Sequence, residues 1–292
     1  MKYEAIKACK NDFSVKRLCR VLQVSRSAYY SWLKREPSAR ECEDAQIVKQ
    51  IKVIFETNRS CYGMPRMRMA LREAGISISR GRVSRLMKLA GCQIKPKKAW
   101  KPCTTQSDCL NPVQANHLDR DFKATEPGQK WMGDITYIPT KEGFLYLAAI
   151  IDLFSRKIVG LAMADHMQSS LVETAFDMAW QQERPSQLDI HHTDRGAQYT
   201  SQDYQALLKD KVGQVSMSRK GNCWDSAPIE SFWGTLKTEC ASGVFDTLTQ
   251  ARTEIFSYIM GFYNIIRLHT ALDYVSPCQF EHAYLRSIYC PN

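Results

Sequence analysis

The chain has 292 residues, of which 44% are hydrophobic, and its 40 Lys and Arg against 30 Asp and Glu give a net charge of +10. It has no run of about 18 apolar residues and no apolar core near its start, which excludes a transmembrane helix and a secretory signal. We therefore expect a cytoplasmic globular protein whose basic excess favours a polyanionic partner such as nucleic acid.

The eleven cysteines form no CxxC pair, and without a secretory signal we expect them to remain reduced thiols. Zinc binding is the alternative, and its nearest candidate ligands are Cys103, Cys109 and His117. Their spacing matches no usual zinc site, so we disfavour a metal there.

The first expected module is a helix-turn-helix over residues 13–34, within a domain that spans 1–38. Ser25 suits the N-cap of the second helix, and Arg26 near the start of that helix could reach a DNA groove. An ordinary helical hairpin is an equally good interpretation, because aromatic residues at this spacing usually pack inside; these residues are Tyr29, Tyr30 and Trp32.

A second helix-turn-helix-like domain is predicted over residues 39–92, with helices at 43–58, after Pro65 and after Ser79. Its Met residues, Met64, Met67 and Met69, are expected to fill the core. The last helix has a basic face that we expect to project outward and hold DNA phosphates: Arg80, Arg82, Arg85 and Lys88.

Residues 93–125 predict a loosely structured basic linker, and residues 126–242 predict a catalytic domain. Three strands joined by hairpins come first, with a tight turn at Lys141–Gly143 between the first two. There follow a crossover helix over 169–182, a strand that ends at Asp194, a helix over 201–211 and a last short strand. This order predicts an α/β fold built on a mixed β-sheet.

Three acidic residues have distinctive flanks: Asp134 in WMGDITYI, Asp194 in LDIHHTDRGAQ and Glu230 in SAPIESFWGTLKTEC. The first two are separated by 59 residues and the last two by 35. Mg²⁺ prefers carboxylate oxygens, and two such ions about 3.5–4 Å apart can serve the attacking and leaving oxygens of a phosphodiester. We interpret the three acids as one metal cluster. For any single acid a solvated charge or a cap is the commoner role, so the hypothesis rests on all three together.

Other polar residues near the acids carry weaker signals. Asp152 ends a strand close to Asp134 and is interpreted as support for the turn at Ser155. Alternation along a strand sends His191 and His192 to opposite faces. A structural role is favoured for both histidines over a role beside the metals.

The loop RKGNCWDSAP is expected to lie beside the acids. Arg219 and Lys220 could hold DNA phosphate, while Trp224 could stack on a base or simply anchor the loop. Asp225 or Ser226 could cap the helix that follows.

Along that helix, Lys237 lies two turns after Glu230 and shares its face, so Trp233 and Lys237 would line the DNA-facing side. A merely solvated lysine is the alternative. Residues 247–266 predict an amphipathic helix within a C-terminal extension over 243–292. That extension could pack on the core, contact DNA or join protomers, and its pattern does not choose among these.

These motifs resemble the DDE core of OrfB-type transposases from bacterial insertion sequences, the family named after insertion sequence three. The resemblance is carried by WMGDITYI, HTDRGAQYTS, KGNCWDSAPIESFWGTLKTE and the tail YNIIRLHTALDYVSPCQF, and it covers nearly the whole chain. Ser226 departs from the asparagine of many relatives, which questions local substrate contacts and not the chemistry. The family's core is similar to the retroviral integrase domain. The resemblance thus implies an RNase H-like α/β fold, a mixed five-stranded sheet with flanking helices, preceded by all-α helix-turn-helix segments.

The resemblance also implies a DNA transposase in which Asp134, Asp194 and Glu230 bind two Mg²⁺ ions, with Mn²⁺ as a substitute. Its expected partners are double-stranded DNA at the nucleoid, a second copy of the chain and a helix-turn-helix protein from an upstream frame. The alternatives are a non-catalytic DNA-binding regulator and an RNase H-type nuclease. The intact triad disfavours the first, and the helix-turn-helix segments disfavour the second.

Overall fold

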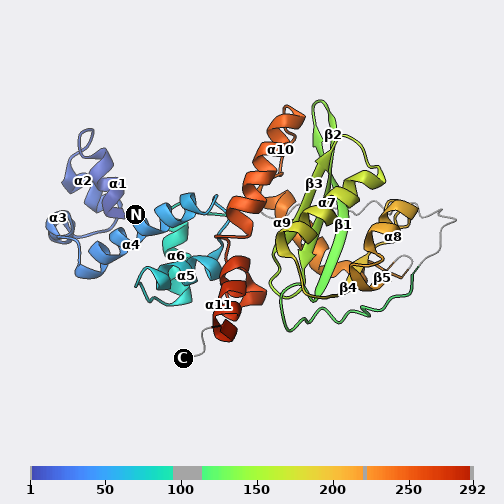
Figure 1. Ribbon diagram of the computed structural model, residues 1–292. Coiled ribbons are helices and arrows are strands. Elements are labelled where there is room, and N and C mark those ends of the chain that lie inside the picture. The colour runs from blue at the N-terminus through green and yellow to red at the C-terminus, as the bar shows by residue number, and fades with distance from the viewer. Residues whose placement is uncertain (1, 95–113, 220–221, 290–292) are drawn as a thin grey trace.

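The computed structural model describes residues 2–94, 114–219 and 222–289. The N-terminal helices lie at one end of the molecule, and a sheet flanked by helices lies at the other (Figure 1). None of the helices in these ranges is both long and apolar enough to cross a membrane. The cysteines whose side chains are described are free thiols.

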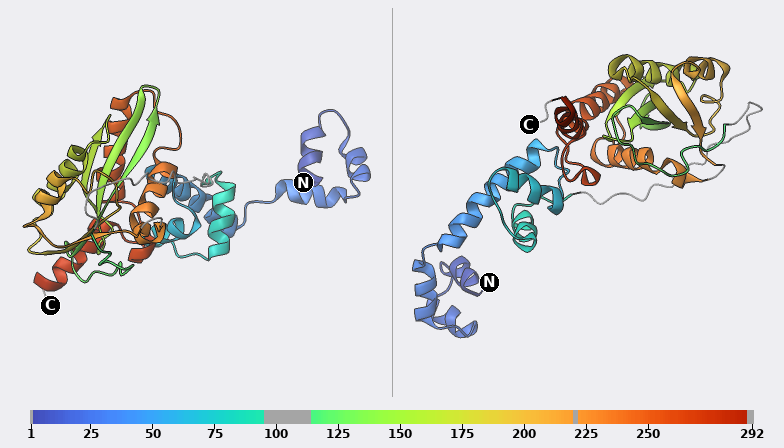
Figure 2. Two further views of the ribbon diagram at one scale, coloured as in Figure 1. Left: turned by 90° about the vertical axis from the view of Figure 1, so that its right-hand side faces the viewer. Right: turned by 60° about the horizontal axis from the view of Figure 1, so that its bottom comes forward.

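The N-terminal module consists of α1 (Lys2–Cys9), α2 (Val15–Val21) and α3 (Arg26–Lys34), and it stands apart from the sheet in both views of Figure 2. The predicted helix-turn-helix is confirmed in α2 and α3, while α1 was not expected. The Ser25 side chain caps α3 by accepting a hydrogen bond from the Ala28 amide. Tyr29 is buried and stacks on Trp32, whereas Tyr30 is 44% exposed, so only part of the aromatic set packs inside.

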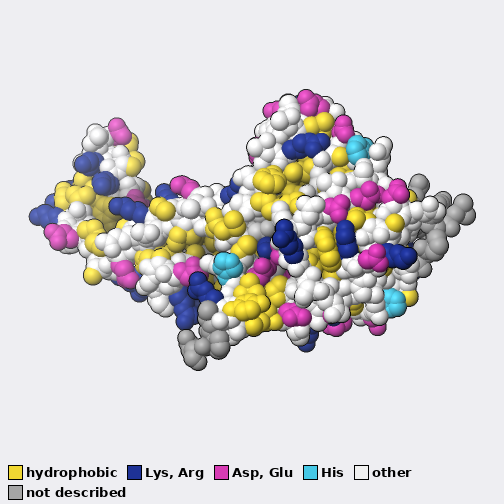
Figure 3. All heavy atoms as spheres, viewed as in Figure 1, with side chains coloured by type: hydrophobic (Ala, Val, Ile, Leu, Met, Phe, Trp, Pro, Cys, Tyr) yellow, Lys and Arg dark blue, Asp and Glu magenta, His cyan; other side chains and the backbone are white. Residues whose placement is uncertain are grey.

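The second helical region consists of α4 (Ala39–Thr57), α5 (Met64–Glu73) and α6 (Arg80–Leu89). A capping box formed by Ser38 and Glu41 starts α4 four residues before the predicted start. Met67 is fully buried, as predicted for core filler, and the apolar cluster around it is continuous with that of the sheet. In Figure 3, Lys and Arg side chains stand out over the N-terminal helices at the left.

The sheet has the strand order β3-β2-β1-β4-β5. Pairing is antiparallel among β1, β2 and β3, and parallel from β1 to β4 and from β4 to β5, which confirms the predicted mixed five-stranded sheet. The turn between β1 and β2 is tight, and Gly143 follows it with a φ of +129°, a conformation that only glycine adopts readily. The strands are β1 (Lys130–Thr140), β2 (Gly143–Asp152), β3 (Ile158–Ala164), β4 (Leu188–Thr193) and β5 (Val212–Met217).

Helices cover both faces of the sheet. On one face lie α7 (Ser169–Glu183) and α8 (Gln202–Leu208), and on the other lie α9 (Ala227–Glu239) and α10 (Leu248–Phe256). Successive side chains of β1 alternate between the two layers, so Trp131 packs under α7 and Met132 packs in the other core. The middle strand is thereby covered on both sides.

The C-terminal extension packs on the core, which is one of the three roles considered for it from its sequence. After α10 the chain continues as a π-helix (Ser257–Tyr263), a 3-10 turn (Thr270–Leu272) and α11 (Pro277–Tyr289), so the single helix predicted over 247–266 changes its winding halfway. The side chain of Asn264 bonds both the amide and the carbonyl of Ile158 in β3. Arg267 forms a double contact with Glu239 of α9 at 2.7 and 2.6 Å.

The segment 114–125, named here the connector, was wrongly predicted to be loosely structured. Its Leu118 side chain is buried, and the amides of His117 and Leu118 both donate to Ser216 Oγ at the end of β5. The Ala115 carbonyl accepts from the Met217 amide. The connector therefore lies against the sheet. The rest of the predicted linker, 95–113, lies outside the described residues.

Candidate active site

Asp134 and Asp194 come from neighbouring parallel strands. The register pairs Met132 of β1 with His192 of β4. Continuing this register by two residues sets Asp134 beside Asp194, which directly follows β4. Neighbouring strands lie about 4.8 Å apart, so the two carboxylates emerge next to each other.

Both carboxylates are held by specific donors. Asp134 Oδ2 accepts a hydrogen bond of 2.9 Å from Trp233 Nε1 on α9. Asp194 Oδ1 accepts one of 2.8 Å from the amide of Gly196, where the chain turns away from the sheet. Burial raises the pKa of Asp134, and the neighbouring Asp194 carboxylate raises it further. Burial also raises the pKa of Asp194.

Glu230 lies in the first turn of α9, the helix that packs across β1. Burial raises its pKa, and its charge adds to the factors that raise the pKa of Asp134, although less than Asp194 does. The three acids therefore belong to one electrostatic neighbourhood. Within the described ranges, no three His, Cys, Asp or Glu side chains are arranged closely enough to form a metal site as they stand.

The donor chemistry of this site fits a divalent cation. Two partly buried carboxylates side by side repel each other, and a bound cation would relieve both the repulsion and the cost of their burial. Oxygen donors of this kind suit Mg²⁺ and Mn²⁺. Asp134, Asp194 and Glu230 are the residues that would hold the ion.

Trp233 was predicted to line the DNA-facing side of α9, but it packs into the protein. Its side chain is 6% exposed, and its indole N–H is used by Asp134. Lys237 lies one turn further along α9, with Nζ 5.5 Å from the ring centre of Tyr137. Burial lowers the pKa of Lys237, and the Asp134 charge opposes that change, so this lysine belongs to the same site.

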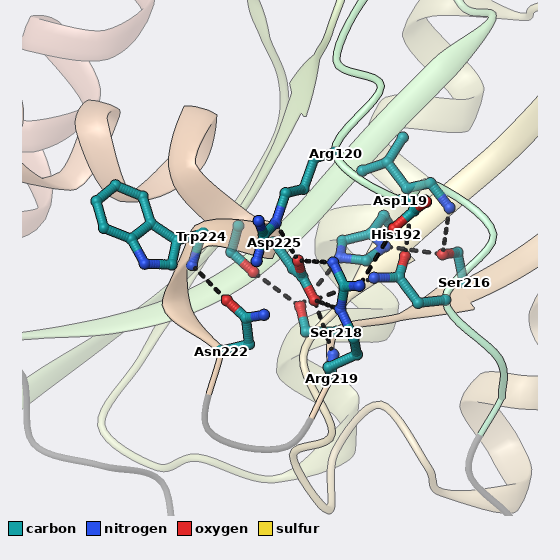
Figure 4. Close-up of polar contacts among 12 residues, drawn as sticks. Asp119, Arg120, His192, Ser216, Ser218, Arg219, Asn222, Trp224 and Asp225 are labelled. Atoms are coloured by element: carbon teal, nitrogen blue, oxygen red, sulfur yellow. Dashed lines mark hydrogen bonds and ion pairs between the residues drawn. The ribbon is translucent and has the colours of Figure 1, made fainter.

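The loop before α9 differs from its prediction in several ways. Ser226 occupies the N-cap position of α9, as one of the two options predicted, but its side chain makes no capping hydrogen bond. Asp225 is fully buried and paired with Arg219 and Arg120 (Figure 4). Arg219, expected on DNA phosphate, is thus engaged within the protein. Trp224 is 69% exposed and free of the core. Lys220 lies outside the described residues.

The basic residues predicted on the helical region fall into two groups. Arg82 does not project outward, because it pairs with Glu43 and Asp44 of α4. Arg85 also reaches Asp44, at 2.5 Å, but half of its side chain remains exposed. Lys88 on α6 and Arg26 on α3 are exposed as expected.

The supporting residues behave as the sequence predicted. Asp152 Oδ1 accepts from the amide and hydroxyl of Ser155 and closes the turn after β2. His191 bonds Tyr204 at 2.7 Å, and His192 bonds Ser216 and Ser218, so both are buried structural residues. The sequence did not reveal the Trp233 donor, because Trp233 and Asp134 are 99 positions apart in the chain.

Comparison with protein families gives matches along most of the chain. An HTH-like domain matches residues 41–100, and two integrase core domain families match residues 124–223 and 230–285. Among solved structures, an intasome of simian T-cell lymphotropic virus bound to a PP2A regulatory subunit aligns over 74% of this chain and 70% of its own, with 17% identity and a TM-score of 0.46. The magnesium-bound HTLV-2 integrase catalytic core aligns over 55% of this chain and 100% of its own, with 18% identity and a TM-score of 0.40. The matched domains and the mixed sheet define an integrase-core polynucleotidyl transferase with an N-terminal helix-turn-helix-like region.

Similar sequences identify the family of this chain within that class of enzymes. The transposase InsF of insertion sequence IS3A from Escherichia coli K12 is 40% identical over 98% of this chain and 100% of its own. The IS904 transposase of Lactococcus lactis is 44% identical over 85% and 98%, and a 31 kDa protein of insertion element IS600 from Shigella sonnei is 42% identical over 91% and 98%. The chain belongs to the transposase family of insertion sequence three, as its motifs indicated.

Proposed function

We propose that Asp134, Asp194 and Glu230 are the catalytic carboxylates of this transposase and hold two Mg²⁺ ions, for which Mn²⁺ can substitute. The observation that supports this most is the half-buried pair formed by Asp134 in β1 and Asp194 directly after the neighbouring parallel strand β4. Two ions held by these residues would activate the attacking oxygen and stabilise the leaving oxygen of a phosphodiester. Glu230 would complete the ligand set from the first turn of α9.

The proposed reaction is two successive displacements at phosphorus. Water attacks the phosphodiester at the end of the element and breaks the bond to its 3′ oxygen, which leaves a 3′-OH. That hydroxyl then attacks a phosphodiester of the target and displaces the 3′ oxygen of the target strand. No protein nucleophile is needed, and the role of Trp233 is to orient the Asp134 carboxylate for both steps.

The DNA contacts are proposed on the basis of exposure and charge. Lys237, Lys220 and Trp224 would contact the DNA end beside the carboxylates, and Lys88, Arg85 and Arg26 would hold phosphates further along. Arg82 and Arg219 remain candidates of lower rank, because each already has carboxylate partners within the protein.

We propose a separate role for each of the predicted domains. The helical domains 1–38 and 39–92 bind the end of the element, and the core 126–242 catalyses the reaction. The extension 243–292 stabilises the core. Joining two ends requires two active sites, so we propose at least a dimer on DNA at the nucleoid. A helix-turn-helix protein from an upstream frame would add end recognition, either fused to this chain or bound to it.

The direct test of these roles uses the variants Asp134→Asn, Asp194→Asn and Glu230→Gln, each close to its parent in shape. Each variant is expected to lose both cleavage and strand transfer by at least about a thousandfold on DNA that carries the element's ends, since a metal ligand is removed. A gel shift should show DNA affinity within a few-fold of the parent. Wild-type cleavage by any one of them would remove that residue from the proposed site.

A further inference from the structure

Asp225 is a buried carboxylate in the 3-10 turn Cys223–Ser226, directly before α9, and the residues around it are shown in Figure 4. Oδ2 accepts hydrogen bonds of 3.0 Å from Asn116 Nδ2 and from both the backbone amide and Nε of Arg219. Oδ1 accepts from Arg120 Nε at 3.0 Å and from Arg219 Nη2 at 2.7 Å. Charge-assisted bonds of this kind are the strong ones, so they fix the base of α9.

The donors to Asp225 come from two different segments. Arg219 belongs to the same loop as Asp225, whereas Asn116 and Arg120 belong to the connector, which leads from the helix-turn-helix-like domain into the sheet. The start of the catalytic helix is therefore held partly by a segment outside the core strands. Arg120 has a side chain that is 47% exposed, so its main contact is with Asp225 and not with the apolar core.

A second series of hydrogen bonds also links the connector to the start of α9, and it passes close to Asp194. His192, two residues before Asp194, bonds Ser216 Oγ at 2.8 Å and Ser218 Oγ at 3.0 Å. Ser218 continues to Ser226 Oγ at 3.0 Å, at the start of α9. Ser216 also accepts the connector amides of His117 and Leu118. The connector thus contacts Ser216 of β5, which bonds His192 of the strand that leads to Asp194, and it also contacts Asp225 in the turn before the helix that carries Glu230.

We propose that Arg120 is a positioning residue that acts through Asp225 to set the first turn of α9, and hence Glu230, against Asp134 and Asp194. In this proposal the carboxylate set is complete only when the connector is docked, which ties the chemistry to the DNA-binding end of the chain. The proposal rests on the proposed role of Glu230. It predicts that a small displacement of Glu230 lowers the rate of DNA cleavage strongly, since a shift of about 1 Å at reacting groups can lower a reaction rate about a hundredfold.

The test compares Arg120→Gln with Lys123→Gln in the full-length chain. Both variants remove one positive charge from the connector, but Lys123 is exposed and makes no contact with Asp225. Single-turnover cleavage at saturating DNA and the dissociation constant for the same DNA are measured for each. Arg120→Gln is expected to cut about tenfold more slowly with affinity within about twofold, and Lys123→Gln is expected to leave both within about twofold.

A readout independent of activity is amide hydrogen exchange of residues 222–232 in the free protein. Exchange there should be faster in Arg120→Gln and unchanged in Lys123→Gln. Asp225→Asn should reproduce both effects, and adding Arg120→Gln to it should slow cleavage by less than a further twofold, because the two residues act as one unit.

The results that would contradict the role of Arg120 differ from those that would contradict the role of Glu230. Wild-type cleavage and exchange in Arg120→Gln would overturn the proposal, and so would a loss confined to the dissociation constant, which would make Arg120 a DNA contact. Glu230→Gln is measured in parallel. If that variant is fully active, the proposed role of Glu230 fails; if it is inactive while Arg120→Gln is normal, only the present inference fails.

Discussion

At the scale of single residues, the site depends on how the half-buried carboxylate of Asp134 is oriented. Asp134 has a hydrogen-bond donor in Trp233, and the indole ring itself packs beside Phe232 in the core. Trp233→Phe keeps an aromatic ring and removes only the N–H. A hydrogen bond to a charged group contributes about 1.5–3 kcal/mol, so cleavage should slow by roughly tenfold or more.

The matched control for that prediction is Trp180→Phe, the same change in α7, where the ring packs against Trp131 and Phe176 far from the carboxylates. Its cleavage rate should stay within about twofold of the parent. Equal rates for the two variants, measured in single turnovers, would show that the Trp233 donor does not orient Asp134.

Asp225 makes stability depend on pH in a defined direction. The hydrogen bonds from Arg219 hold its pKa below the usual value of 3.8. A lowered folded pKa gives stability that is present above about pH 4 and is lost as the pH falls through the folded pKa. Asp225→Asn should therefore lower the free energy of unfolding at pH 7 by about 2 kcal/mol, which is less than for a fully buried pair because Arg219 is half exposed.

Urea unfolding of the parent and Asp225→Asn at pH 7 and at pH 3 measures this dependence. The difference between the two proteins should shrink at pH 3. A difference that stays constant or grows would mean that the Asp225 charge does not stabilise the loop.

At the scale of elements, α7 packs so closely on β3 that only glycine fits between them. A Cβ at Gly160 would overlap the carbonyl oxygen of Ala175 and touch the Ala179 side chain. Gly160→Ala should lower the free energy of unfolding by about 2–3 kcal/mol. Gly81→Ala in α6, where a Cβ meets nothing within 4 Å, should be neutral or raise it by about 0.5 kcal/mol. Thermal unfolding of both variants decides whether this contact sets the position of α7.

Most elements could be predicted from the sequence because local signals define them. Serine caps mark the starts of α3 and α8, and alternation with a tight turn marks the hairpin of β1 and β2. The π winding after α10 has no such signal, and the contact of Asn264, at its end, with the backbone of Ile158 joins residues far apart in the sequence. The connector was missed for the same reason: its polar composition resembles a linker, and its order comes from distant Ser216 and Asp225.

The site itself was only partly predictable. The three acids are marked by their flanks, whereas the partners of Trp233, Arg219 and Arg82 are decided by tertiary contacts. Each of these three side chains was expected on DNA, and each is instead used by a carboxylate of the protein. A basic or aromatic residue on a helix face gives no indication, in the sequence alone, of which acid will come to lie opposite.

At the scale of the whole molecule, the helix-turn-helix-like region and the catalytic core form one continuous unit. Arg66 of α5 donates to the carbonyl of Leu268 at 2.8 Å and lies 3.7 Å from Glu239, at the far end of the helix that carries Glu230. Tyr62 donates to the carbonyl of Ile266 and accepts from the amide of Leu268. Both ends of α9 are therefore tied to parts of the chain outside the sheet, which sequence patterns cannot show.

The most direct test of the account is a crystal structure of the chain with bound DNA end and Mn²⁺, in which anomalous scattering locates the metal. Two Mn²⁺ peaks about 3.5–4 Å apart are expected among the carboxylates of Asp134, Asp194 and Glu230. Saturating Mn²⁺ in a cleavage-competent crystal with no peak between these three residues would contradict it.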